Sequence, residues 1–232
     1  IIALHWITFF EGIEQSNISV TLAMFSTAAF FTSFLEPLFF KRKIIFYEII
    51  LGLLVVVGVF LIFKSEFNYV NGIILGLFSA LFASIFSVLN GVMIKNNSAI
   101  TISFYEFTSG VAFISIYLFI TKNMDSLLIE NFFSLNYLYI FLLGSVCTAY
   151  AFIASVYLLK YITPYSVVLT YNLEPIYGII LALIFFGDNE KMSTQFYIGL
   201  FIILTSVLIN MYVKAKCVFL GRFPCLISCE KC

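Results

Sequence analysis

Long apolar runs, separated by short polar or charged breaks, follow one another along most of the chain. Each run is apolar on all sides of a helix rather than along one stripe, which is typical of a membrane span. A helix needs about 20 mostly apolar residues to cross a bilayer. The runs predict eight membrane-crossing helices, at roughly 1–15, 18–40, 44–63, 71–94, 99–121, 136–159, 163–187 and 194–213.

Transmembrane β-strands are the alternative, but a barrel needs alternating segments of about 10 residues. These runs are about twice as long and do not alternate, so the predicted fold class is an all-α polytopic membrane protein. The links between runs are short, which implies antiparallel neighbours in a bundle. The longest link, 122–135, is polar enough to be a loop.

Composition strengthens this assignment. Apolar residues make up 62% of the 232 residues and charged residues 10%, whereas a soluble domain has roughly 45–50% and about 25%. So few charges could not cover a soluble fold of this apolar content. The formal net charge is zero, and no basic-aromatic stripe is present, so we expect no nucleic-acid partner.

The positions of Lys and Arg predict the orientation, because cytoplasmic loops carry an excess of both. If the loop at 41–43 is cytoplasmic, nine basic residues lie inside and three lie outside, and the opposite orientation reverses this ratio. We therefore expect the C-terminus in the cytoplasm. The inside set is Lys41, Arg42, Lys43, Lys95, Lys160, Lys214, Lys216, Arg222 and Lys231, and the outside set is Lys64, Lys122 and Lys191.

Both ends of the chain are unusual. It begins Ile1-Ile2-Ala3 with no basic n-region, which is not a signal peptide, so we expect a fragment that begins inside a hydrophobic segment.

Cys147 lies in an apolar run and suits packing. The tail 214–232 holds the other four cysteines, Cys217, Cys225, Cys229 and Cys232. Their spacing does not match paired zinc-ligand sets, which favours a disordered or non-native tail over a metal site.

The chain repeats itself at an offset of 147 residues. Ser19-Val20 falls on Ser166-Val167, and Gly52-Leu53 falls on Gly199-Leu200. The basic loop 41–43 falls on the acidic Asp188-Asn189-Glu190. A repeat unit with an odd number of helices would enter the membrane in opposite orientations, and the positive-inside rule would then invert the charge of the loop. Inverted repeats of this kind are typical of secondary transporters, with a site near the midplane.

Several segments resemble the EamA-type branch of the drug/metabolite transporter superfamily, most closely its bacterial members of the Bacteroidetes type. They are Ala3-Leu4-His5-Trp6, Leu35-Glu36-Pro37-Leu38-Phe39-Phe40, Phe104-Tyr105-Glu106, Thr163-Pro164-Tyr165, Asn172-Leu173-Glu174-Pro175 and Phe185-Phe186-Gly187-Asp188. The family commonly has Glu where Asp188 stands. The resemblance covers about residues 1–213. It implies ten helices in two inverted five-helix repeats and transport of small metabolites, often as efflux, across the bacterial inner membrane.

This resemblance organises the chain into three parts. Residues 1–64 would be the last three helices of a first repeat that is truncated at its N-terminus. Residues 65–213 would be a second repeat of five helices, and residues 214–232 would be the Cys-rich tail.

Polar groups inside hydrocarbon are costly, so each calls for a reason. Glu174 lies 11 residues after Thr163, about 16 Å along a helix, and Pro175 would kink the helix beside it. A carboxylate there suits a substrate amine or a transported proton, with Asn172 and Tyr171 as neighbouring contacts. The alternative is a protonated or paired glutamate that fixes helix packing.

Four further residues are weaker candidates for substrate binding. Glu106 lies on the cytoplasmic side of centre, where a second carboxylate could carry a proton or make a structural hydrogen bond. His5, near mid-depth, suits either a proton relay or packing, and Trp6 could line the cavity or pack. Thr27 aligns with Glu174 under the offset, although small polar residues more often serve helix packing. Glu36 and Asn90 lie near cytoplasmic helix ends, where a structural role is favoured.

The sequence holds one His, no Gly-x-Ser-x-Gly and no phosphate-binding Gly-rich loop, so we predict no catalytic residues, no cofactor and no metal. The leading hypothesis is a secondary transporter. The alternatives are a membrane interaction or assembly protein without transport and, less favoured, an intramembrane enzyme. Expected partners are the lipid bilayer, a small-molecule substrate, a coupling proton or ion and, as an open alternative, a second copy of the chain.

Overall fold

In the computed structural model the described residues are 1–41, 46–121, 135–171 and 173–219, and all their regular secondary structure is helical. The helices are α1 (Ile2–Glu14), α2 (Ile18–Phe25), α3 (Ala28–Phe40), α4 (Phe46–Ser65), η1 (Phe67–Tyr69), α5 (Val70–Met93), α6 (Ala99–Thr121), α7 (Leu135–Leu142), the π-helix η3 (Leu143–Tyr150), α8 (Ala151–Leu158), α9 (Pro164–Tyr171), α10 (Glu174–Phe186), η4 (Gly187–Glu190) and α11 (Thr194–Phe219). The predicted all-α class is confirmed.

The predicted spans coincide with these helices. Among the described residues, four segments are long and apolar enough to cross a membrane, namely Ile18–Phe40, Phe67–Met93, Ala99–Ile120 and Leu135–Leu158. Three shorter apolar helices, Ile50–Ser65, Glu174–Phe186 and Thr194–Asn210, accompany them. The chain is therefore a polytopic membrane protein.

Three differences from the predicted bounds stand out. The runs 18–40 and 163–187 each form two helices rather than one. Helix α11 continues to Phe219, so the first residues of the tail 214–232 are helical, and the rest lies outside the described residues. The loop predicted at 122–135 also lies almost wholly outside them.

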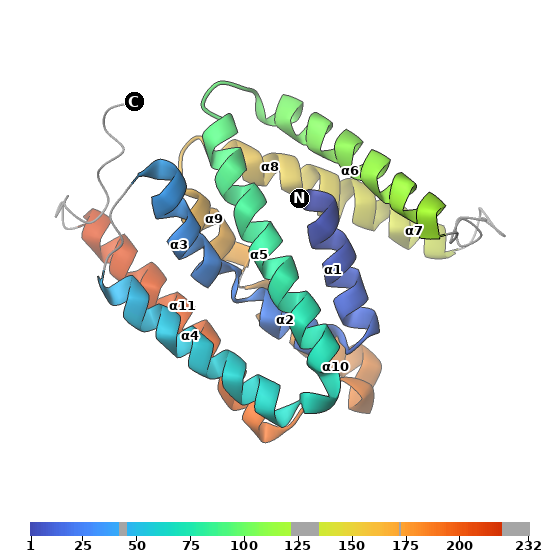
Figure 1. The fold of residues 1–232 in the computed structure, drawn as a ribbon, viewed down its shortest axis with the longest axis vertical. Helices are drawn as coiled ribbons and strands as arrows, with labels where there is room; N and C mark the ends of the chain where they lie inside the picture. The colour runs from blue at the N-terminus through green and yellow to red at the C-terminus, as the bar shows by residue number, and fades with distance from the viewer. Residues whose placement is uncertain (42–45, 122–134, 172, 220–232) are drawn as a thin grey trace.

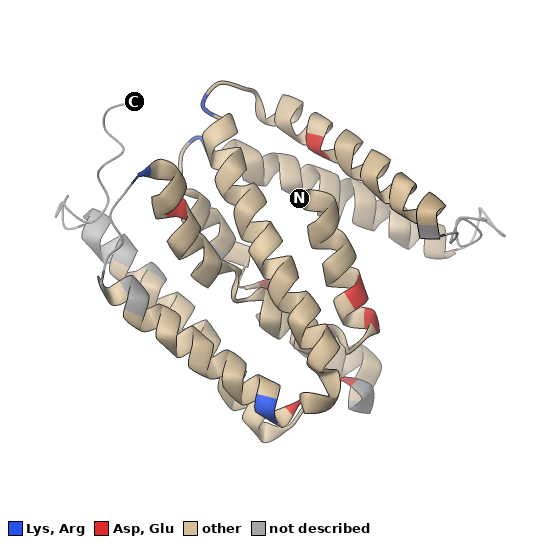
Figure 2. Ribbon diagram, viewed as in Figure 1, with Lys and Arg blue, Asp and Glu red and all other residues tan. Residues whose placement is uncertain are grey.

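The helices form three groups (Figure 1). Helix α4 packs along α11 on one side of the bundle, and α6 packs against α8 on the other. Between these pairs lie α1, α5 and the two broken helices, with α5 in contact with α1, α2 and α3. The charges of the described residues lie mostly near helix ends, and long stretches of helix carry none (Figure 2).

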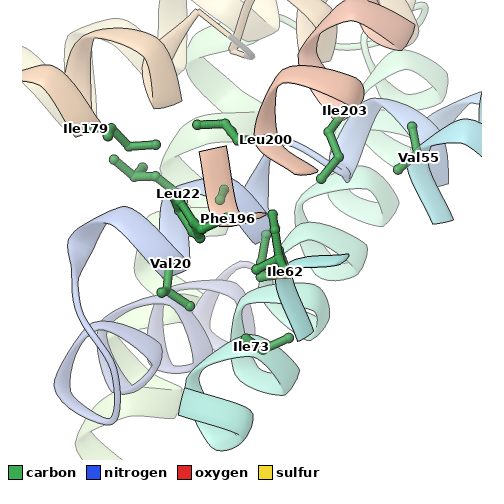
Figure 3. Packing of buried hydrophobic residues seen from close by; sticks show 11 residues of the cluster. Val20, Leu22, Val55, Ile62, Ile73, Ile179, Phe196, Leu200 and Ile203 are labelled. Carbon is green, nitrogen blue, oxygen red and sulfur yellow. The ribbon is translucent and has the colours of Figure 1, made fainter. Parts of the chain in front are cut away.

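The main apolar core joins α2, α4, α5, α10 and α11 (Figure 3). It includes Val20 and Leu22 from α2, Ile62 from α4 and Phe196 and Ile203 from α11, all buried. A second cluster joins α2, α3, α5, α9 and α11. Because segments from distant parts of the sequence share one core, the first four helices and the last three are held as one body.

Helices α4 and α11 approach each other closely at a pair of glycines. A Cβ atom built on Gly199 would lie 2.7 Å from the carbonyl oxygen of Gly58, and one built on Gly58 would lie 2.8 Å from the carbonyl oxygen of Gly199. Small residues allow membrane helices to approach this closely, since helix association in lipid depends on van der Waals packing. The two glycines therefore set the spacing of the pair.

Candidate functional site

The break between α2 and α3 is produced by two consecutive hydroxyl residues. The Ser26 hydroxyl donates to the Ala23 carbonyl at 2.6 Å, and the Thr27 hydroxyl donates to the Met24 carbonyl at 2.7 Å. The Thr27 backbone N–H also bonds Met24 rather than Ala23. Side chains that take the carbonyls of the preceding turn bend a helix or interrupt its ladder. Thr27, a predicted site residue, is buried here and its hydroxyl is engaged.

The break between α9 and α10 has a different cause. Helix α9 ends at Tyr171 and α10 begins at Glu174, with Pro175 in its first turn. Proline has no N–H, so it cannot bond the carbonyl four residues earlier, which here belongs to Tyr171. Asn172 lies outside the described residues.

The two broken helices pack against each other. Helix α2 contacts α10, and α3 contacts α9. Gly178 allows the first contact, because a Cβ there would overlap the Leu22 side chain. The first break therefore lies inside the bundle, with Ser26 and Thr27 buried, where backbone groups released from the helix are sheltered from lipid. Beside the second break, Leu173 and Glu174 are exposed.

A buried carboxylate caps the N-terminus of α2 from the far end of the chain. Glu190, 5% exposed, accepts hydrogen bonds from the backbone N–H groups of Ile18 and Ser19 at 3.1 and 2.9 Å. Asn17 caps the next N–H, that of Val20, at 2.8 Å. The first N–H groups of a helix have no partner within the helix, and a carboxylate there also interacts favourably with the helix dipole.

The N-terminus of α9 is capped in the same way at the opposite end of the bundle. Glu36 of α3 accepts a hydrogen bond from the backbone N–H of Tyr165 at 2.9 Å. The structural role expected for Glu36 therefore takes the form of a cap on α9. Each of the two broken helices therefore begins on a carboxylate supplied by the other one or, for Glu190, by the 3-10 turn that follows it.

His5 lies at the contact of α1 with α5. Its Nδ1 lies 3.0 Å from the Ser79 carbonyl oxygen and 2.9 Å from the Ser79 hydroxyl. The rings of Phe9, Phe25 and Phe86 surround it at centroid distances of 6.0, 5.5 and 5.5 Å. This buried imidazole is held in one orientation and joins α1, α2 and α5.

Aromatic rings continue from His5 toward Trp6. Phe86 contacts Phe152 at 5.9 Å, Phe152 contacts Phe107 at 5.1 Å, and Phe107 stacks on Trp6 at 5.9 Å. We call Trp6, Phe86, Phe107 and Phe152 the aromatic cluster. It connects α1, α5, α6 and α8. Of its members, only Trp6 is a site residue predicted from the sequence.

Tyr171, a predicted neighbour of the carboxylate Glu174, lies next to this cluster. Tyr171 packs against the apolar clusters that contain Phe86 and Phe152 and hydrogen-bonds Ser155 of α8. Glu174 is exposed, at the first residue of α10, and its charge acts on Tyr171. No described residue hydrogen-bonds its carboxylate, which is therefore available to a ligand.

Glu106 hydrogen-bonds Asn90, a contact that the sequence did not predict. The Asn90 side chain of α5 donates from Nδ2 to Oε2 of Glu106 at 3.1 Å. Glu106 is half-buried and precedes Phe107 of the aromatic cluster. Of the predicted site residues, Trp6 belongs to this cluster, and His5 and Tyr171 pack beside Phe86. Thr27 is buried at the break between α2 and α3.

A separate small pocket, open on one side, lies between α3, α4, α9 and α11. Most of its lining is apolar, and its polar lining residues are Ser33, Tyr165, Ser206 and Asn210. The Ser206 hydroxyl and the Asn210 Oδ1 are buried and have no hydrogen-bond partner among the described residues. None of the predicted site residues lines this pocket.

Two functional-looking residues were missed from the sequence. The sequence predicts Glu190 only as part of an acidic loop, whereas in the structure it caps the N-terminus of α2. The sequence favours a structural role for Asn90, and its contact with Glu106 depends on how α5 and α6 pack. In the described part of the chain no three His, Cys, Asp or Glu residues are placed to hold a metal ion.

The model of the EamA-like transporter family matches residues 70–212, which is more than half of the chain and covers α5 through most of α11. Comparison with curated proteins and with solved structures yields no match. The helical membrane architecture and this match lead to one conclusion: the chain belongs to the EamA-like transporter family.

Proposed function

We propose that the chain is a secondary transporter that exports a small metabolite, an amino-acid-like compound or a drug by alternating access between two inverted repeats. The family assignment supports a transporter of the drug/metabolite class. The proposal adds the direction of transport, the substrate and the repeat organisation. The two repeats would be residues 1–64 and 65–213. The transported molecule would enter between the repeats and be released when the bundle rearranges.

One observation carries this proposal: the helix breaks occur at equivalent positions of the two repeats. Thr27, at the first break, and Glu174, at the second, are 147 residues apart, which is the offset of the sequence repeat. In transporters built from inverted repeats, substrate and ion sites are formed by discontinuous helices near the midplane. The crossing of α2–α3 with α9–α10 supports a site of that kind.

The proposed location is the bacterial inner membrane, with the C-terminus in the cytoplasm. Lys95 lies 5.3 Å from the centroid of the Phe40 ring, so the ends of α3 and α5 share one face of the bundle with Lys41. Glu66 and Glu190 lie at the other face, where Glu66 accepts a hydrogen bond from the Ser193 N–H at 3.0 Å. This separation supports a cytoplasmic Lys95 face under the positive-inside rule.

We assign substrate binding to Glu174 with Tyr171 and Asn172, and further contacts with the substrate to His5, Trp6 and Glu106. The exposed, unbonded carboxylate of Glu174 would bind a cationic group, and the aromatic cluster would supply apolar contact. Thr27 would act indirectly, by fixing the break of α2–α3. Coupling of transport to a proton or ion, and assembly of the chain as a homodimer, are further predictions.

Replacing Glu174 by glutamine is expected to reduce export strongly. A hydrogen bond to a charged group contributes about 1.5–3 kcal/mol, so its loss should lower the rate at limiting substrate by about tenfold or more. Cells producing the chain are compared with cells producing Glu174→Gln, and small metabolites in the medium are measured by mass spectrometry. Glu14→Gln, at the exposed end of α1, is the matched control and should export normally.

Two outcomes would contradict the proposal. If Glu174→Gln exports at the wild-type rate at equal membrane levels, the assignment of the site is wrong. If the wild-type chain is inserted and no metabolite differs from control cells, the transporter function is wrong for this chain and an assembly role is favoured.

A further inference from the structure

The contact between Asn90 and Glu106 leaves one strong hydrogen-bonding atom unused. Asn90 lies in the last turn of α5 and is 1% exposed. Its Nδ2 donates to Glu106, but its Oδ1 has no hydrogen-bond partner among the described residues. A buried amide oxygen without a donor is costly, and an ion or water that is not part of the chain is a common explanation.

A second unpaired oxygen lies on the same helix as Glu106. Ser103 is 1% exposed, and its hydroxyl oxygen also has no hydrogen-bond partner within the described chain. Ser103 and Glu106 are three residues apart on α6, so their side chains lie on the same side of that helix. The region between α5 and α6 therefore offers a carboxylate, an amide oxygen and a hydroxyl oxygen.

The charges around Glu106 favour a single positive ion. Asn90 lies at the C-terminal end of α5, where the helix dipole carries partial negative charge. Lys95, the nearest lysine along α5, is directed to the Phe40 ring. One carboxylate and one monovalent cation give a neutral pair, whereas a divalent ion would leave a net charge inside the bundle, which is costly there.

We propose that Glu106, Asn90 and Ser103 bind a sodium ion, and that this ion is coupled to transport. Hard cations prefer oxygen ligands from carboxylate, amide and hydroxyl groups. On binding, the Asn90 amide turns its Oδ1 toward the ion, and the Ser103 hydroxyl contributes a lone pair. The coupling role rests on the proposed transporter function, but the binding site does not.

The only tryptophan of the chain reports on this site. Trp6 stacks on Phe107 with a centroid distance of 5.9 Å, and Phe107 follows Glu106. The purified chain in detergent is titrated with NaCl at constant ionic strength, with choline chloride as the balancing salt, and tryptophan fluorescence is recorded. The titration is done at pH 9, where an ordinary carboxyl group is ionised. We expect a saturable change with NaCl and a much smaller one with KCl.

Three variants test the ligands. Glu106→Gln, which keeps an acceptor for Asn90, should abolish the response to sodium. Asn90→Leu should weaken sodium affinity by about 10-fold or more, as removal of groups around a metal commonly does. Glu14→Gln should respond like the wild-type chain. Thermal melting provides a second measurement, because an ion that binds the folded state raises the melting midpoint, and this rise should be absent in Glu106→Gln.

Three results would overturn the assignment. The first is no sodium response of the wild-type chain at pH 9, as expected of a site that binds only protons or water. The second is an equal response to KCl, and the third is an unchanged response in Glu106→Gln. Because no substrate is needed, a chain that exports without binding sodium refutes this inference alone. A chain that binds sodium and exports nothing refutes the proposed function alone.

Discussion

Replacing Gly199 by leucine is expected to lower the free energy of unfolding by about 3 kcal/mol, the upper part of the usual range for overpacking. A Cβ at this position would lie 2.7 Å from the Gly58 carbonyl oxygen and 2.8 Å from Cγ1 of Ile62. The first of these atoms belongs to the backbone and cannot rotate away. Helices α4 and α11 would have to separate, and their shared core around Ile62 and Phe196 would lose contact.

The change is measured as the shift of the thermal unfolding midpoint in detergent. Gly144→Leu is the matched control, since a Cβ at Gly144 would meet no atom within 4 Å. We expect the control to unfold at nearly the wild-type temperature. Equal midpoints for the two variants would show that α4 and α11 do not depend on the glycine contact.

Replacing Glu190 by alanine should have the second largest effect on stability. The substitution leaves the N–H groups of Ile18 and Ser19 without their acceptor, and each buried group left unpaired costs about 1–3 kcal/mol. Release of the carboxylate from its buried position offsets part of that cost. We therefore expect a loss of roughly 2–3 kcal/mol in the free energy of unfolding.

Denaturation in increasing fractions of a harsh detergent measures this loss. Glu190→Gln keeps a neutral acceptor oxygen and should lose less than half as much, whereas Glu11→Ala, on α1, should lose little. An alanine variant as stable as the wild-type chain would mean that water or another group replaces the cap.

The helices could be predicted from the length of the apolar runs, because a bilayer sets a minimum length and excludes polar backbone. The two helix breaks differ in how clearly the sequence signals them. Pro175 marks the break before α10. The run 18–40 contains no proline near its centre, and Ser26 and Thr27 interrupt it only because their hydroxyls bond the preceding turn.

The candidate site could be predicted only where a single residue was informative. Glu174 and Glu106 stand out as charges within apolar runs. Their surroundings depend on packing between distant segments, and that part was not predictable from one sequence. Glu190, for example, caps a helix that begins 172 residues earlier in the chain, and no local pattern distinguishes it from other acidic residues of a loop.

The cap on α2 has a consequence for biosynthesis. When α2 first enters the membrane, Glu190 has not yet been made, so the N–H groups of Ile18 and Ser19 must be satisfied by water or headgroups at the surface. The same holds for α4, whose partner α11 is the last helix described. We therefore expect the early helices to stay incompletely packed in the bilayer until α11 (Thr194–Phe219) has been made and inserted, and ribosomal stalling before that point should leave them susceptible to membrane proteases.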